Sequence, residues 1–305
     1  MTALLGPEPN LMRQSGAELR MRRTSAGDEG TGIALALGGG FSRGFAHLGV
    51  LEVLEQEQIP ISAIVGTSIG GLLGAACADG IPIRQLLEIG RQVRVRDFIR
   101  FHKSDQDTQR NDRIGRFVRE WFHASRVEEL SIRTAIVTTD LNTCAPHVFT
   151  RGPLEVAIRA SCAFPGLFQP VEHEGRRLTD GCIVAPVPTA VAARMNGACV
   201  LGVTVGSNAK NASSSDNVVQ VRDREFSAPH RNIVVPSWIR QADVLLEPEV
   251  HHIDWNDFSR VDEAHAAGVE AMRRALPYVR DLLARRSQMR LPEEHSSRPQ
   301  SGMAL

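Results

Sequence analysis

The sequence predicts an α/β protein with a three-layer α/β/α architecture, in which a mainly parallel central sheet lies between two layers of helices. Three observations predict it. Short runs rich in Ile, Val and Ala alternate with helical patterns, as expected when helices connect parallel strands. These runs are continuously apolar, which is typical of strands covered on both faces. The chain has 305 residues, 42% of them hydrophobic, which is enough to bury one large core.

The expected elements alternate along the chain. The helix after the first strand is the clearest, because apolar residues from Phe45 to Leu54 recur every three positions and lie on one helical face. This order places a ligand site at the carboxyl ends of the strands. Strands are expected at Gly32 to Leu37, Ser62 to Gly66, Arg133 to Thr138, His147 to Phe149 and Ala198 to Val205, and helices at Arg43 to Gln56, Ile69 to Ala78, Pro82 to Gln92 and Ser259 to Arg286.

Composition divides the chain into one domain and two flanking segments. Residues 32–288 are expected to form the domain, between a flexible leader at 1–31 and a disordered tail at 289–305. Within the domain, residues 91–126 interleave arginines with aromatic and aliphatic side chains and predict a basic helical cap. Residues 206–236 are polar and serine-rich, which is typical of a long surface loop or lid.

The segment from Ile59 to Ala78 is free of charged residues over the length that a membrane-spanning helix needs. Its four glycines instead favour a buried strand, a tight turn and a closely packed helix. Because the leader also lacks an apolar signal segment, a cytoplasmic location is expected. The basic cap has two interpretations, a solvated helix face or a surface that approaches anionic lipid, and the second predicts peripheral membrane contact.

The charges of the chain balance. It has 35 Lys and Arg residues and 35 Asp and Glu residues, so no net field favours nucleic acid as a partner. The five cysteines are scattered and show neither a CxxC pair nor a zinc spacing. We expect reduced thiols and predict no metal and no other cofactor. The oligomeric state is left open.

The segment Gly66-Thr67-Ser68-Ile69-Gly70 follows an apolar strand and opens a helix of small residues. This is the context of a nucleophile elbow, in which a sharp strand-to-helix turn exposes the serine hydroxyl. Gly66 and Gly70 flank the turn because side chains there would collide with nearby backbone. The alternative is a glycine turn in which Ser68 caps the helix. The flanking strand and helix favour Ser68 as a nucleophile.

A glycine-rich loop, Gly38-Gly39-Gly40-Phe41-Ser42-Arg43-Gly44, stands between the first strand and the first helix. It lacks the Gly-Lys-Ser/Thr ending of a P-loop, and Arg43 occupies the third-glycine position of a dinucleotide motif. The next strand ends without an acidic residue to hold a ribose. Nucleotide binding is therefore not expected. If Ser68 is a nucleophile on the neighbouring strand, the backbone amides of this loop are expected to form an oxyanion hole.

Asp180 precedes a glycine, a little after the turn-like segment Glu172 to Gly175. An Asp-Gly pair taken alone is usually a turn. A serine nucleophile, however, needs a base near its hydroxyl, and a carboxylate in a partly desolvated cleft gains the proton affinity for that role. Asp180 is therefore a candidate base for Ser68.

Taken in this order, these segments resemble the patatin-like phospholipase family, in particular its bacterial members and the catalytic domain of neuropathy target esterase. Gly38 to Gly44 resembles the family's oxyanion loop, Gly66 to Gly70 its serine elbow and Asp180-Gly181 its Asp-Gly element. The resemblance runs from about Gly32 to Leu283. It also includes Thr139 to Leu141, Ala160 to Pro170, Asp243 to Pro248, Trp255 and Asp257-Phe258.

The resemblance implies a patatin-like serine lipid acyl hydrolase, of phospholipase A or lysophospholipase type, with a histidine-free dyad of Ser68 and Asp180. It implies that the amides of Gly38 to Gly40 hold the oxyanion while an acyl-enzyme forms and while water hydrolyses it. It also implies that Arg43 is either structural or a helper at that loop. A lipid or lysophospholipid ester is the implied substrate, without calcium. Cys182 replaces the small residue that the family commonly has there, which puts the setting of Asp180 in question.

Two alternatives stay open. One is a conventional α/β-hydrolase with a Ser-His-Asp triad, for which the chain offers ten histidines, none in a telling motif. Of these, His47 is interpreted as a packed helix residue. The nearby polar candidate Ser161 is interpreted as a hydrogen-bonded serine at a helix end. The other alternative is a regulatory adaptor that keeps the fold without the chemistry.

Overall fold

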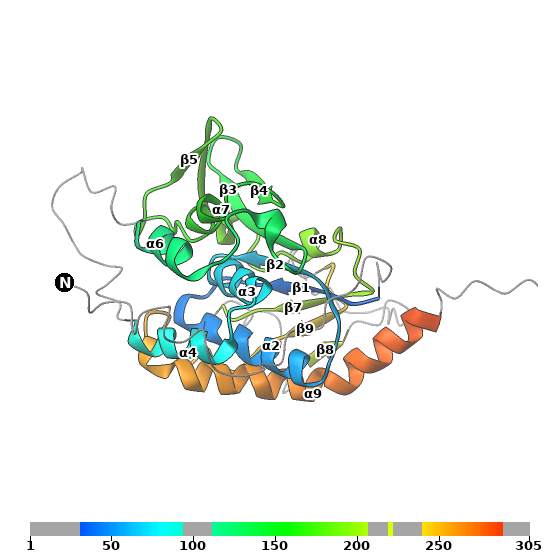
Figure 1. The fold of residues 1–305 in the computed structure, drawn as a ribbon. Coiled ribbons are helices and arrows are strands. Elements are labelled where there is room, and N and C mark those ends of the chain that lie inside the picture. The colour runs from blue at the N-terminus through cyan, green and yellow to red at the C-terminus, as the bar shows by residue number, and fades with distance from the viewer. Residues whose placement is uncertain (1–30, 94–111, 207–218, 222–239, 289–305) are drawn as a thin grey trace, which may run out of the picture.

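A computed structural model describes residues 31–93, 112–206, 219–221 and 240–288 of the chain. Over these residues the chain forms one mixed sheet flanked by helices (Figure 1). The strands are β1 (Ile33–Leu37), β2 (Ile61–Thr67), β3 (Thr134–Asp140), β4 (Ala145–Phe149), β5 (Val171–His173), β6 (Arg176–Asp180), β7 (Cys199–Val203), β8 (Val219–Val221) and β9 (Val244–Leu246). The helices are α2 (Ala46–Gln56), α3 (Ile69–Asp79), α4 (Ile83–Gln92), α6 (Asp112–Trp121), α7 (Leu154–Ser161), α8 (Thr189–Ala192) and α9 (Val261–Gln288), with short 3₁₀ helices η1 (Phe41–Phe45), η2 (Val127–Glu129), η3 (Gly181–Ile183) and η6 (Phe258–Arg260).

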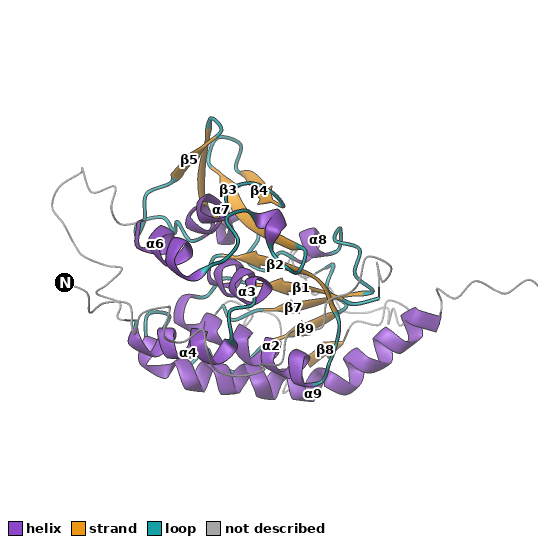
Figure 2. Cartoon of the chain, in the orientation of Figure 1, coloured by secondary structure: helices purple, strands orange, loops and turns teal. Residues whose placement is uncertain are grey.

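The centre of the sheet is parallel, through the pairs β3 with β2, β2 with β1, β1 with β7 and β7 with β9. Antiparallel strands extend it at both sides (Figure 2). On one side β8 pairs with β9. On the other, β4 and β6 pair with β3, and β5 pairs with β6. The prediction of a three-layer fold with a mainly parallel sheet is confirmed. The strand predicted at His147 to Phe149 belongs to β4 and is antiparallel, because it returns directly from β3 as a hairpin.

Strand β3 pairs with three neighbours. Over Ile136–Asp140 one of its edges pairs with β4. Its other edge is shared, because Thr134–Val137 pair with β2 and Thr138–Asp140 pair with β6. A strand offers hydrogen bonds along only two edges, and β6 runs antiparallel to β2. The carboxyl ends of β2 and β6 therefore meet head to head along one edge of β3.

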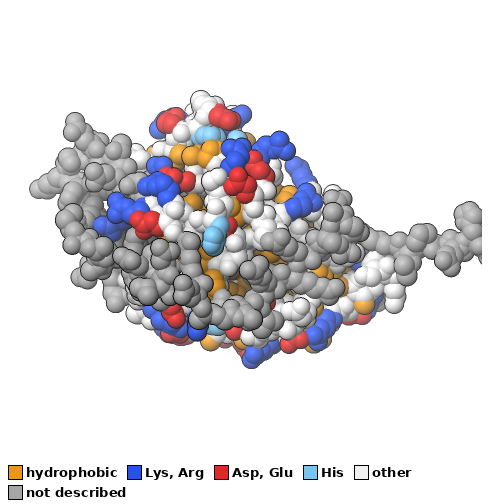
Figure 3. All heavy atoms as spheres, in the orientation of Figure 1, with side chains coloured by type: hydrophobic (Ala, Val, Ile, Leu, Met, Phe, Trp, Pro, Cys, Tyr) orange, Lys and Arg blue, Asp and Glu red, His pale blue; other side chains and the backbone are white. Residues whose placement is uncertain are grey.

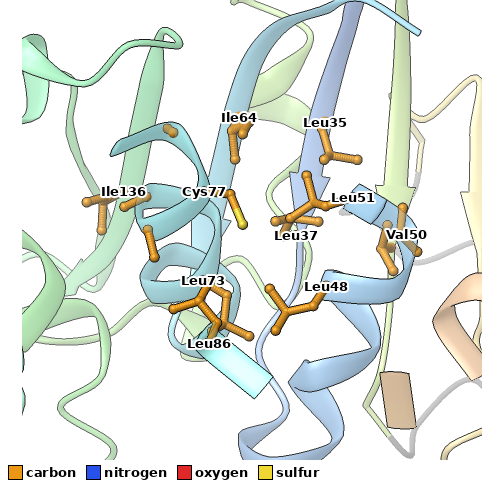
Figure 4. Packing of buried hydrophobic residues seen from close by; sticks show 14 of the residues in the cluster. Leu35, Leu37, Leu48, Val50, Leu51, Ile64, Leu73, Cys77, Leu86 and Ile136 are labelled. Atoms are coloured by element: carbon orange, nitrogen blue, oxygen red, sulfur yellow. The ribbon is translucent and has the colours of Figure 1, made fainter. Parts of the chain in front are cut away.

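The two faces of the sheet carry side chains of different size. Figure 4 shows Leu35, Leu37, Ile64 and Ile136 of the strands turned toward α2 and α3, where large apolar residues cover them. The opposite face is lined by small residues under the short helix α8. Because successive side chains of a strand alternate between faces, each central strand contributes to both layers. The small-residue face includes Ala34, Ala36, Ala63, Val65, Ala135 and Val137.

Helix α9 lies along α2 at close range (Figure 1). Gly49 of α2 and Gly268 of α9 face each other's backbone. A Cβ atom on Gly49 would overlap the carbonyl oxygen of His265, and one on Gly268 would overlap that of Ala46. The absence of side chains at these two positions therefore sets the distance between the helices.

Substitution of Gly268 by valine is expected to lower the free energy of unfolding by about 2 kcal/mol, because the added atoms must push α9 away from a packed partner. Thermal denaturation should show a melting temperature lower by several degrees. Ala266→Val is the matched control, since Ala266 lies on the exposed face of the same helix. Equal melting temperatures for the two variants would contradict this account of the crossing.

Several predicted segments fall partly or wholly outside the described residues. They are the leader up to residue 30, the cap over residues 94–111, most of the predicted lid and the tail from residue 289. One correction arises inside the lid range, where residues 219–221 form strand β8 on the edge of β9 instead of irregular loop. Strand β8 has only three residues, which is too short to show an apolar periodicity from which a strand could be predicted.

The described parts of the predicted basic cap are residues 91–93 and 112–126, and the second part contains helix α6. Its aromatic side chains point inward, since Trp121 and the following Phe122 are buried and pack against Phe117 at ring-centroid distances of 6.1 Å. Arg119 forms an ion pair with Glu155 of α7 at 2.5 Å. Trp121 and Phe122 thus belong to the hydrophobic core, and Phe117 packs against it. Figure 3 shows Lys or Arg next to Asp or Glu over the described part of one face.

Within the described ranges, no helix combines the length and apolarity that crossing a bilayer requires. The charge-free segment Ile59 to Ala78 contains β2, the turn at Ser68 and α3. The interpretation of this segment as strand, turn and packed helix is confirmed.

Candidate active site

Ser68 lies in the turn between β2 and α3 with φ 54° and ψ −127°. A non-glycine residue with positive φ is strained, and such strain is typical of functional turns. The turn is tight because α3 returns directly over the strand. A Cβ atom on Gly66 would overlap Gly71, and one on Gly70 would overlap the carbonyl oxygen of Leu37. This geometry is that of a nucleophile elbow, with the Ser68 residue 7% exposed.

The backbone of Ser68 is held by a serine from another helix. The Ser68 amide donates to Oγ of Ser161 at 2.8 Å, and the Ser161 hydroxyl donates to the carbonyl oxygen of Val137 on β3 at 2.7 Å. Ser161 is fully buried and is the last residue of α7. Its interpretation as a hydrogen-bonded serine at a helix end is confirmed. Its contact with the elbow was not predicted, because the two serines are 93 positions apart.

Asp180 is brought to Ser68 by the register of β3. Thr67 stands opposite Val137, and Asp180 stands opposite the next residue, Thr138. The last residue of β6 thus lies where β2 has just ended. Asp180 is fully buried. A one-residue slip of β6 would turn its side chain to the other face of the sheet.

The carboxylate of Asp180 is incompletely paired. Its Oδ1 accepts the amide of Cys182 at 2.8 Å. Its Oδ2 is buried and has no well-formed hydrogen bond within the described residues, although the Ser68 hydroxyl lies near enough to affect its pKa. Burial raises the pKa of Asp180 above its ordinary value, and the contacts with Cys182 and Ser68 lower it by less. The carboxylate therefore has a higher proton affinity than an exposed aspartate.

Cys182 lies between Asp180 and the glycine loop. A Cβ atom on Gly39 would overlap the Cys182 sulfur and would lie 3.3 Å from Cβ of Ser68. The pKa of the Cys182 thiol is raised well above its ordinary value, chiefly by burial, so the thiol stays protonated. Because it is the main-chain amide of Cys182 that holds Asp180, the unusual side chain leaves this hydrogen bond in place.

The glycine loop offers fewer unpaired amides than its sequence suggests. The amides of Gly38 and Gly39 donate to main-chain carbonyls at 3.0 and 3.1 Å. Those of Gly40 and Phe41 have no acceptor in the described part of the chain. Of the three glycines predicted to hold the oxyanion, Gly40 is thus the one with an unpaired amide, and Phe41 adds an amide that was not predicted.

The other end of the loop is tied to the segment before η6. The Ser42 amide donates to the carbonyl oxygen of Trp255 at 3.1 Å, and the Ser42 hydroxyl donates to the same oxygen at 2.9 Å. Arg43 donates from Nε to the carbonyl oxygen of Ile253 at 2.6 Å. The guanidinium of Arg43 thus ties the loop to the segment before η6, a contact of the structural kind, and its part at the oxyanion loop stays a prediction.

No histidine in the described ranges forms a hydrogen bond with Ser68 or Asp180. His47 instead contacts Gly38 through Nε2. The predicted triad alternative is thus without a described candidate, and three histidines lie outside the described residues. Among the described side chains, no three His, Cys, Asp or Glu residues gather as a metal site requires. The three undescribed histidines are His102, His230 and His295.

Aromatic side chains pack together at the glycine loop, around Phe41. The ring of Phe41 makes edge contacts with Phe164 at 5.8 Å and with Trp255 at 5.0 Å between centroids. Phe164 is 39% exposed and Trp255 is 42% exposed. We call these three residues the apolar rim. A separate hollow of about 260 Å³ is lined by Leu141, residues 165–170 and Thr179, and its lining includes neither Ser68 nor Asp180.

The fold and the site together define a class, an α/β protein with a serine elbow beside a glycine loop and a buried aspartate. The model of the patatin-like phospholipase family matches residues 35–193, just over half of the chain. The chain therefore belongs to the patatin-like phospholipase family, and the resemblance seen in the sequence is confirmed.

Relatives extend this match in several organisms. An uncharacterized NTE family protein of Mycobacterium tuberculosis is 35% identical over 204 residues, which are 66% of this chain and 55% of that protein. Human patatin-like phospholipase domain-containing protein 6 is 29% identical over 79% of this chain and 20% of its own length. A lysophospholipase of Kluyveromyces lactis is 30% identical over 62% of this chain and 13% of its own.

The chain thus spans about half the length of its mycobacterial relative and smaller parts of the others. Among solved structures, VipD from Legionella pneumophila aligns with a TM-score of 0.37 and 13% identity, over 64% of this chain and 55% of that one.

Proposed function

We propose that this protein is a serine lipid acyl hydrolase, an esterase of the phospholipase A or lysophospholipase type. The observation that carries the proposal is the meeting of β2 and β6, which brings a strained serine and a buried, incompletely paired carboxylate together. A carboxylate with raised proton affinity beside a serine hydroxyl is suited to general-base catalysis. Membership of the patatin-like phospholipase family supports the same chemistry.

In the first half-reaction, the Asp180 carboxylate takes the proton of the Ser68 hydroxyl while Oγ attacks the ester carbonyl carbon. The carbonyl oxygen becomes an oxyanion, which we assign to the unpaired amides of Gly40 and Phe41. Such donors typically contribute about 3 kcal/mol each to transition-state stabilisation. Asp180 then returns the proton to the departing alcohol, and the acyl group stays on Ser68.

In the second half-reaction, water enters and Asp180 accepts one of its protons as the hydroxide attacks the acyl carbon. The same loop amides hold the second oxyanion. Ser68 leaves with the proton from Asp180, and the free fatty acid departs. Every proton is returned within the cycle, so the proposal needs no histidine and no metal ion.

The apolar rim supports a lipid as the substrate. Its exposed aromatic side chains adjoin the loop that would bind the carbonyl oxygen, and aromatic rings favour contact with acyl chains over water. A substrate drawn from a lipid surface entails peripheral membrane contact, which is part of this proposal together with the cytoplasmic location.

The test is a panel of phospholipids and lysophospholipids with products identified by mass spectrometry. We expect release of free fatty acid and covalent labelling of Ser68 by a fluorophosphonate probe, located by peptide mapping. Liposomes with and without anionic lipid serve as substrate surfaces, and buffer without protein gives the background. A folded protein that releases no fatty acid and does not label at Ser68 would favour the adaptor alternative.

A further inference from the structure

His47 is a buried histidine behind the glycine loop. It lies in the first turn of α2 and is fully buried. Its Nε2 is 2.7 Å from the carbonyl oxygen of Gly38. Because a carbonyl oxygen only accepts, the ring proton is on Nε2. Nδ1 is buried without a hydrogen-bond partner in the described part of the chain.

Burial also keeps this ring neutral. It lowers the pKa of His47 to about 4, while the contact with the Gly38 carbonyl raises it by less. His47 therefore donates through Nε2 without carrying a charge at neutral pH. A neutral donor with an unsatisfied second nitrogen is costly to bury, and packing alone would be served by an apolar side chain of similar size.

The hydrogen bond from His47 fixes one end of a peptide plane. The carbonyl oxygen of Gly38 accepts from His47 at 2.7 Å, and the amide of the same peptide, which belongs to Gly39, donates to the carbonyl oxygen of Pro186 at 3.1 Å. Because a peptide is planar, these two bonds set its orientation. The next amide along the loop is that of Gly40, which is unpaired within the described residues.

The free amides therefore lie between two fixed points. Before them is the Gly38 peptide, bound by His47. After them is Ser42, whose amide and hydroxyl are bound to the carbonyl oxygen of Trp255. A glycine-rich loop would otherwise have many accessible backbone conformations. Fixing both ends limits the directions in which the amides of Gly40 and Phe41 can point.

We propose that His47 is a positioning residue for the oxyanion hole, which holds the Gly38 carbonyl so that the following amides face the reacting ester oxygen. The proposal rests on the hydrolase function proposed above. His47 acts through the loop and not as a base, because its proton-bearing nitrogen is bound to Gly38 and its other nitrogen is buried.

The experiment compares His47→Gln with His47→Asn. Both place a carboxamide in the same helix, but the glutamine nitrogen can reach the position of Nε2, whereas the asparagine nitrogen reaches only that of Nδ1. With a soluble nitrophenyl ester, we expect His47→Asn to lower kcat by about 10-fold to 100-fold, since a misdirected amide loses part of the effect of a deleted donor. KM should stay within about twofold, and His47→Gln should recover most of the kcat.

Folding is controlled by thermal denaturation of both variants, and rates are expressed per folded protein. Wild-type kcat in folded His47→Asn, or equal impairment of both variants at equal stability, would overturn the assignment while leaving the hydrolase proposal intact. If one variant does not fold, the kcat of the other is compared with that of Val50→Ala, a substitution of a buried residue on the same helix. A wild-type protein without esterase activity would instead contradict the hydrolase proposal, and this one with it.

Discussion

Replacement of Ser68 by alanine is expected to reduce ester hydrolysis by at least about 10³-fold, because removal of a serine nucleophile leaves only the rate that binding and oxyanion stabilisation provide. The loss should appear in kcat for short-chain nitrophenyl esters and in fatty acid release from lysophospholipid. Labelling by a fluorophosphonate probe should disappear in the same variant. The strand β2 and the helix α3 on either side are held by main-chain hydrogen bonds, which do not involve the Ser68 hydroxyl. The variant should therefore fold.

The control for this variant is Ser287→Ala, which removes an exposed hydroxyl at the end of α9. It should keep wild-type turnover and labelling. Substantial turnover by Ser68→Ala at an unchanged melting temperature would show that another residue is the nucleophile, and the elbow at Ser68 would then be a structural turn.

Replacement of Asp180 by asparagine should also lower kcat by about 10³-fold or more, because an amide of nearly the same shape cannot accept the serine proton. The pH dependence of the wild type is a second expectation. Since burial raises the pKa of Asp180, and catalysis needs the ionised form, kcat should fall on acidification at a pH above the ordinary range of aspartate. The Asp180→Asn variant should lack this transition.

The same substitution should not destabilise the fold at neutral pH. A carboxyl whose pKa is higher in the folded than in the unfolded state makes the folded state less stable as pH rises from the unfolded pKa through the folded pKa. Asp180→Asn would remove that penalty, so the melting temperature should equal or exceed that of the wild type at pH ~7, with the difference shrinking in acid. Differential scanning calorimetry across this pH range measures it.

Asp140→Asn is the matched control, and we expect it to change the melting temperature in the opposite direction. Hydrogen bonds from the amide of Asn142 and from Arg176 hold the pKa of Asp140 below its ordinary value. Ionised Asp140 therefore stabilises the fold at neutral pH, and its replacement should lower the melting temperature while kcat of the folded protein stays near wild type. If the two variants shifted stability in the same direction, the assigned difference between their carboxylates would be wrong.

The central strands could be predicted from sequence because burial on both faces gives them continuous apolar runs. Strands β5, β6, β8 and β9 were not predicted. β6 contains two exposed arginines before its buried residues, so neither a continuous nor an alternating apolar pattern marks it. Its pairing with β3 joins partners such as Thr138 and Asp180, which are far apart in the sequence, and no local propensity encodes such a contact.

The dyad could be proposed from the chemistry of a serine elbow and an Asp-Gly pair, but the reason for their proximity lies in the shared edge of β3. Which loop amides are unpaired was likewise beyond sequence reasoning. The amides of Gly38 and Gly39 look equivalent to that of Gly40 until the carbonyls around them are placed. The supporting contacts of Ser161 and His47 depend on packing between distant helices and strands in the same way.

The head-to-head meeting of β2 and β6 has a consequence for how such a protein can evolve. Ser68 and Asp180 are placed by main-chain pairing in the centre of the sheet. The apolar rim lies instead on the short helix η1 and on two loops, and loops tolerate substitution and insertion better. If the protein is the hydrolase proposed above, mutation of the rim would alter which acyl chain is accepted while leaving Ser68 and Asp180 in place. In such a framework new specificity would arise at the periphery, while the proposed chemistry at the centre of the sheet is inherited unchanged.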